Sequence, residues 1–265
     1  MRSVFRYKTD VAVRLPYIPP LWRESFAGME AAALFRSPIW RGEGVPDGGG
    51  RPVLLVPGFL AGDGSLTTLT RWLRANGYRT RRAGIRLNVD CSAEACARLE
   101  ERLEAFAADA GEPVVIIGQS RGGAFARALA ARRPELVAGI LTLGAPTVSQ
   151  LRIHPLVLAH VGLVGALGSA RFPGMLRWSC LRGACCAQFR VELTGDVGVP
   201  YTALYSRSDG IVDYHSCLDP AAKLVEVRAS HLGMGLNAQV YAEIAHALAR
   251  LDEPAPRVTD LARAA

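Results

Sequence analysis

The sequence is poor in lysine and has no long apolar run. Only Lys8 and Lys223 are lysines among its 31 basic residues. Its longest apolar stretch, residues 156–167, is shorter than the roughly 20 residues that a membrane span requires. Residues 1–8 have neither the apolar core nor the small-residue cleavage site of a signal peptide. These absences predict a cytoplasmic protein without stable membrane insertion.

Cysteine and histidine occur without the spacing of metal ligands. The chain has six cysteines and five histidines, but no C-x-x-C pair, and no histidine stands at ligand spacing beside a cysteine. We therefore expect no metal, no organic cofactor and mostly free thiols. A local disulfide from Cys180 to Cys185 or Cys186 is left open by the spacing.

The formal net charge is +7, yet no nucleic-acid-binding motif accompanies it. A cluster of Arg79, Arg81, Arg82 and Arg86 is the one concentrated basic segment. Such a cluster either forms a patch for an anionic partner or a solvated face. We expect a solvated face and no nucleic-acid partner.

Apolar segments alternate with amphipathic ones through most of the chain, which is long enough for one large domain. Strands are predicted at 53–56, 78–83, 114–117, 139–143, 201–205 and 223–227. Helices are predicted around 66–73, from 92 past 106, at 122–132 and at 238–251. This alternation predicts an α/β fold, a mostly parallel central sheet with helices on both faces.

Two segments stand outside this pattern. Residues 1–50 form an N-terminal extension in which 21–35 has the apolar spacing of an amphipathic helix. We expect it to pack on the main domain of residues 51–265, and a membrane-surface or gating helix is the alternative.

Residues 148–198 are apolar, rich in Gly and Pro, and predicted to be a lid. The alternative is a pair of ordinary packed helices. The tail after Pro254 is expected to be disordered.

A β-branched run leads into the pattern Gly-x-Ser-x-Gly at Gly118, Ser120 and Gly122, and an alanine-rich helix follows. Strand, sharp turn and helix in this order are the context of a nucleophile elbow. A Cβ at either glycine would crowd the crossing, and the helix N-terminus favours negative charge at the serine. We predict Ser120 as a nucleophile, the alternative being a turn that only packs.

A nucleophilic serine needs a base, and the base needs a carboxylate that orients it. After a nucleophile elbow the acid comes next in the chain and the histidine last. Asp209 follows the strand expected at 201–205 and has a glycine directly after it. His231 follows the strand expected at 223–227. We therefore predict Asp209 and His231 as the acid and the base, with Asp213 as the rival acid.

The negative oxygen that forms in acyl transfer requires two backbone N–H donors. We predict that Arg121, directly after the nucleophile, supplies one. The loop after the first core strand should supply the other, from Phe59 or, second, from Leu60, because Gly58 allows a close backbone approach. Leu60 and Gln119 are candidate substrate contacts.

Taken together, these motifs resemble the α/β-hydrolase superfamily, above all its small bacterial serine esterases and lipases. The matching segments are 57–59, 118–123, 143–146, 208–212 and 230–233, which run in family order within residues 52–250. The resemblance implies a triad of Ser120, His231 and Asp209 that acts through an acyl-enzyme. Many lipases have histidine where this sequence has Gln119 and Pro57, a departure that bears on acyl preference.

The predicted activity is therefore hydrolysis of a small-molecule carboxylic ester with a hydrophobic acyl or alkyl group. An acyltransferase would use the same three residues with an alcohol in place of water. A non-catalytic binding protein on this scaffold would be expected to lose one of the three, and a perhydrolase without cofactor is a weaker alternative.

Overall fold

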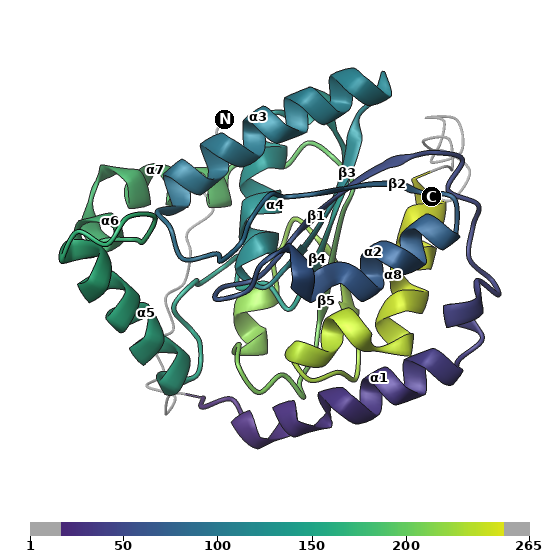
Figure 1. Ribbon diagram of the computed structural model, residues 1–265, viewed down its shortest axis with the longest axis horizontal. Coiled ribbons are helices and arrows are strands. Elements are labelled where there is room, and N and C mark those ends of the chain that lie inside the picture. The colour runs from purple at the N-terminus through teal and green to yellow at the C-terminus, as the bar shows by residue number, and fades with distance from the viewer. Residues whose placement is uncertain (1–16, 252–265) are drawn as a thin grey trace, which may run out of the picture.

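The computed structural model describes residues 17–251, and a six-stranded parallel sheet forms its centre (Figure 1). The strand order is β2-β1-β3-β4-β5-β6. The strands are β1 (Pro52–Val56), β2 (Arg79–Arg82), β3 (Val114–Gln119), β4 (Val137–Leu143), β5 (Tyr201–Tyr205) and β6 (Lys223–Glu226). β1 and β3 are buried along their whole length because helices cover both faces of the sheet. The predicted sheet architecture is confirmed.

Two hydrophobic cores flank the sheet, because successive strand residues point to opposite faces. On one face, Leu54 and Val56 pack with α3 (Ser92–Ala110) and α4 (Arg121–Arg132). On the other, Val53 and Leu55 pack with helices of three different parts of the chain. These helices are α1 (Ala27–Arg36), α2 (Thr67–Ala75) and α8 (Ala238–Arg250).

Short 3₁₀ helices occupy several of the connections. They are η1 (Leu21–Phe26), η2 (Ile39–Arg41), η3 (Asp63–Leu66), η4 (Pro134–Leu136), η5 (Tyr214–Cys217) and η6 (Leu232–Leu236). η5 and η6 follow the carboxyl ends of β5 and β6 respectively, so that the edge of the sheet is formed by irregular backbone. Ligand sites of open α/β sheets lie at this edge.

The segment 148–198 contains α5 (Pro155–Ser169), α6 (Trp178–Arg182) and α7 (Ala184–Thr194). α7 belongs to the core of the molecule, where its Phe189 packs edge-on against Phe125 of α4 at 5.7 Å between ring centroids. α5 and α6 lie farther from the sheet, at the left of Figure 1. α5 carries no charged residue and exposes Leu156 and Leu163.

The helix expected at 21–35 is present as η1 and α1, and α1 packs against η6 and α8 (Figure 1). The apolar spacing of residues 21–35 does not mark the face of these helices that packs against η6 and α8. Trp22 and Met29 are 64% and 61% exposed, whereas Leu34 is buried. Carboxylates of the same segment face the main domain instead, as described below.

No helix of residues 17–251 is long and apolar enough to cross a membrane. All six cysteines lie in this range and are free thiols, so neither pairing considered for Cys180 is present. The expectations for residues 1–8 and for the tail after Pro254 concern positions outside the described residues.

Candidate active site

Ser120 occupies the sharp turn between β3 and α4 with φ +51° and ψ −124°. A positive φ is strained for a residue with a side chain, and such strain gathers at functional sites. The Ser120 N–H donates to the carbonyl of Leu143 at 2.8 Å. A Cβ on Gly118 would collide with the backbone of Gly122, and one on Gly122 with that of β1. The glycines therefore allow the strand and helix to cross this closely.

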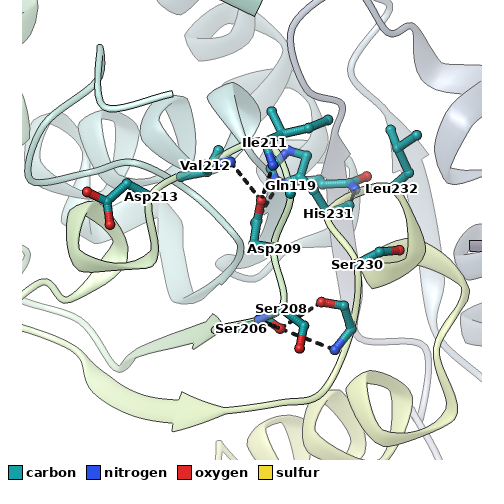
Figure 2. A network of polar contacts seen from close by, with 12 residues as sticks. Gln119, Ser206, Ser208, Asp209, Ile211, Val212, Asp213, Ser230, His231 and Leu232 are labelled. Carbon is teal, nitrogen blue, oxygen red and sulfur yellow. Dashed lines mark hydrogen bonds and ion pairs between the residues drawn. The ribbon is translucent and has the colours of Figure 1, made fainter. Parts of the chain in front are cut away.

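His231 and Asp209 meet at the carboxyl edge of the sheet (Figure 2). His231 Nδ1 lies 2.6 Å from Asp209 Oδ2, and the two residues are 5% and 2% exposed. The other oxygen of Asp209 accepts the N–H groups of Ile211 and Val212 at 2.8 and 2.7 Å. These bonds fix the carboxylate, and the carboxylate fixes the orientation of the imidazole.

Asp213, the rival acid, lies in a separate arrangement. Its Oδ1 is 2.7 Å from His215 Nδ1, and its Oδ2 pairs with Arg152 at 2.5 Å. Figure 2 shows its side chain apart from Asp209 and His231. The structure thus brings Asp209, and not Asp213, to the histidine.

The pKa of His231 is raised above its ordinary value of 6.5. Burial lowers it, but the charge and hydrogen bond of Asp209 and the charge of Glu24 together outweigh that effect. The protonated imidazole is therefore stabilised. The neutral form predominates only above this raised pKa.

Glu24 of η1 binds the loops that carry Asp209 and His231 through their backbone. Its Oε1 accepts the N–H groups of Gly210 and His231 at 2.8 and 2.9 Å, and its Oε2 accepts that of Leu232 at 2.7 Å. A Cβ on Gly210 would lie 2.7 Å from the carbonyl oxygen of Pro20 and 2.8 Å from Glu24 Oε1. The glycine after Asp209 therefore makes room for the segment that carries Glu24.

Glu30 of α1 adds a second connection of the same kind. Its carboxylate accepts the N–H of Ser230 at 2.8 Å and the side-chain amide of Asn237 at 3.0 Å. The carboxylates of the N-terminal helices thus hold the loop that carries His231. No spacing in the sequence signals these contacts, because the partners are some 200 residues apart.

Replacing Glu24 by glutamine should lower the pKa of His231. The substitution removes a negative charge that favours the protonated imidazole, so the proton is lost at lower pH. Titration of the imidazole signals by NMR measures this directly in a protein with five histidines. Glu43→Gln, which changes an exposed carboxylate paired with Arg41, is the matched control. An unchanged or higher pKa in Glu24→Gln would contradict the electrostatic role.

The loop after β1 lies directly against Ser120. A Cβ on Gly58 would lie 3.1 Å from Ser120 Cβ. Within the described residues, the backbone N–H groups of Phe59 and Arg121 donate to no other group, whereas the N–H of Leu60 donates to Asn88 at 3.4 Å. Phe59 and Arg121 therefore have free donors beside the serine, and Leu60 is engaged.

The side chain of Arg121 ties the elbow to this loop. Its guanidinium donates to Asn88 Oδ1 at 2.8 Å and to the carbonyl of Asp90 at 2.5 Å. Asn88 Nδ2 in turn donates to the carbonyl of Pro57 at 2.8 Å. Burial lowers the pKa of Arg121 to about 10, against the opposing effect of Cys96, so the group stays charged at neutral pH. Sequence reasoning identified neither Asn88 nor this side-chain role.

A cavity of about 440 Å³ opens over Ser120 and His231. Its walls are mostly apolar and come from the 58–61 loop, the start of α4, the 150–181 segment and the loops that carry Asp209 and His231. The aliphatic lining residues are Leu60, Ala61, Ala124, Pro146, Leu151, Ile153, Val157, Val161, Leu176, Leu181, Ile211, Val212 and Leu232. Its volume lies within the usual range for small-ligand sites.

Ser120 and His231 line this cavity together, although no hydrogen bond joins their side chains among those of residues 17–251. Leu60 and Gln119 also line the cavity. The Gln119 amide donates to the carbonyl of His231 at 3.0 Å, so it holds the histidine as well as facing the cavity.

Neither a family model nor a curated protein matches the sequence. Solved structures match it in fold. The alignment with the mature lipase BlEst2 of Bacillus licheniformis covers 77% of this chain and 94% of the lipase chain, at 16% identity and a TM-score of 0.58. The alignment with a monoacylglycerol lipase of Paleococcus ferrophilus covers 78% of this chain and 96% of the lipase chain, at 13% identity and a TM-score of 0.53.

The alignment with an alpha/beta superfamily hydrolase of Oenococcus oeni covers 78% of this chain and 94% of that hydrolase, at 15% identity and a TM-score of 0.53. At such identities the likeness concerns the fold. The parallel sheet, the elbow after β3 and these solved structures lead to one conclusion: the chain has the α/β-hydrolase fold.

Proposed function

We propose that the protein is a serine hydrolase of carboxylic esters, with Ser120 as nucleophile, His231 as base and Asp209 as the orienting acid. One observation carries the proposal. Ser120, on its strained turn, shares an apolar cavity with a histidine whose Nδ1 is held by a buried carboxylate. These are the nucleophile, base and orienting group that acyl transfer requires.

In the proposed reaction, Ser120 Oγ attacks the ester carbonyl while neutral His231 takes the hydroxyl proton at Nε2. The backbone N–H groups of Phe59 and Arg121 stabilise the negative oxygen. His231 then gives its proton to the departing alcohol, which leaves an acyl group on Ser120. Water, deprotonated by His231, then attacks that acyl group, and His231 returns the proton to Ser120 Oγ as the carboxylic acid leaves. Because the base must be neutral, turnover should fall as the pH drops below the raised pKa of His231.

The substrate class follows from the cavity walls. Apart from the catalytic side chains, the lining is largely aliphatic, and α5 contributes Val157 and Val161 from a helix without charge. Burial of a hydrocarbon chain there would contribute about 0.8 kcal/mol per methylene. We therefore propose an ester with a hydrophobic acyl or alkyl group, with α5 and α6 serving as a lid.

A panel of p-nitrophenyl esters of increasing acyl length tests the activity and the substrate class together. We expect kcat/KM to rise from acetate to medium-chain esters because the chain enters the apolar cavity. Labelling with a fluorophosphonate, followed by peptide mapping, should place the modification on Ser120. Labelling at another residue, or no turnover of any ester, would sink the proposal.

A further inference from the structure

The molecule holds a cluster of three thiols outside the catalytic groups, formed by Cys91, Cys180 and Cys185. We propose that these residues form a zinc site that joins the segment of α5–α7 to the main domain. Their three Sγ atoms all lie within 4.8 Å of one another. Cys91 is buried, and the other two are half-buried.

The three ligands come from separate elements. Cys91 directly precedes α3 in the main domain, Cys180 lies in α6, and Cys185 is the second residue of α7. A backbone hydrogen bond of 2.8 Å from Leu176 to Val89 holds the loop before α6 next to the loop before α3. Sequence spacing could not show the cluster, because Cys91 is distant from the other two along the chain.

The geometry suits a tetrahedral thiolate site. Zinc binds thiolate at about 2.3 Å, which places two sulfurs of a tetrahedron roughly 3.8 Å apart. The observed separations therefore require each pair to approach by at most about 1 Å. Three protein ligands leave a fourth position, which water would fill.

The arrangement of the thiols suits a metal ion better than a disulfide. A metal ion can use all three converging sulfurs, whereas a disulfide would use only two of them. Metal binding displaces the thiol protons, so the affinity of the site should rise with pH.

The surroundings match the charge of such a site. Zinc with three thiolates carries a net charge of −1. The Arg121 guanidinium donates to the carbonyl of Asp90, the residue before Cys91, and has no carboxylate partner within residues 17–251. The backbone N–H of Arg177 lies 3.4 Å from Cys180 Sγ, where it can donate to a metal-bound sulfur.

Metal titration of the full-length protein tests the site without reference to ester hydrolysis. The chelator-stripped protein, kept reduced with a phosphine, is titrated with Zn²⁺ against a chromophoric chelator, and its Tm is followed. We expect one zinc per chain, a raised Tm and weaker binding at low pH. Co²⁺ in place of Zn²⁺ should give a thiolate charge-transfer band.

Three substitutions to serine, at Cys91, Cys180 and Cys185, should each weaken zinc binding by more than about 100-fold, because each removes a ligand. Cys186→Ser is the matched control, since it changes a half-buried thiol of α7 that is not in the cluster. If Cys91→Ser fails to fold, the two half-buried positions carry the test. The proposal is overturned if zinc does not bind or if Cys186→Ser weakens binding equally. It is also overturned if the protein isolated without reductant holds a disulfide within the cluster and the reduced protein binds no zinc.

Discussion

Replacing Ser120 by alanine should lower kcat for a p-nitrophenyl ester by about 10⁴- to 10⁶-fold, because it removes the atom that we propose forms the acyl-enzyme. The residual rate would come from the backbone donors and from binding alone. Ser120 has a strained backbone but a small side chain, so alanine fits the same space. We therefore expect the Tm to change little, and the loss to appear in kcat rather than in folding.

The matched control is Ser65→Ala, which removes another hydroxyl that lines the same cavity. Ser65 Oγ donates to the carbonyl of Gly62, and its loss should leave kcat within a few-fold of the wild-type value. Stopped assays with purified protein, combined with fluorophosphonate labelling, measure both effects. Turnover by Ser120→Ala at the wild-type rate would refute the nucleophile.

Replacing Asp209 by asparagine should lower kcat by about 10⁴-fold. Asparagine keeps an oxygen for the N–H groups of Ile211 and Val212, so the loop can retain its shape. Its amide cannot stabilise the imidazolium of His231, and it favours the wrong tautomer. The pKa of His231 should also fall, because its largest favourable partner loses its charge.

Asp213→Asn provides the comparison for this prediction. Asp213 is equally buried, but its carboxylate contacts Arg152 and His215 and does not reach His231. We expect Asp213→Asn to reduce stability while leaving kcat within about 10-fold of wild type, an effect below the 10⁴-fold expected at Asp209. Steady-state kinetics and thermal unfolding of the two variants separate these cases. A larger loss of kcat in Asp213→Asn would reverse the assignment of the acid.

The sheet and the order of the site residues could be predicted because they depend on local pattern. Apolar runs such as 114–117 identify buried strands without knowledge of their partners. Parallel strands end at one edge, so side chains that follow β3, β5 and β6 must gather there. Ser120, Asp209 and His231 could therefore be placed near one another before any contact was known.

The packing of the N-terminal helices on the rest of the chain was predicted, but the face that packs was not, because most apolar residues of the expected helix do not lie on it. Trp22 and Met29 belong to that expected helix but lie in solvent, while Glu24 meets backbone N–H groups that only the folded loops present. The thiol cluster escaped prediction for the same reason. Cys91 meets Cys180 and Cys185 through the placement of α6 and α7, which no short-range pattern encodes.

The Glu24 contacts also bear on the order of folding. Glu24 is joined to partners 186 to 208 positions later in the chain. Closing so long a loop costs entropy that is recovered only when the intervening sheet is formed. The loops of Asp209 and His231 should therefore reach their final shape in the last step of folding, when the first helices close onto a nearly finished domain. A refolding experiment should show native sheet before catalytic competence, with the interval between them set by this closure.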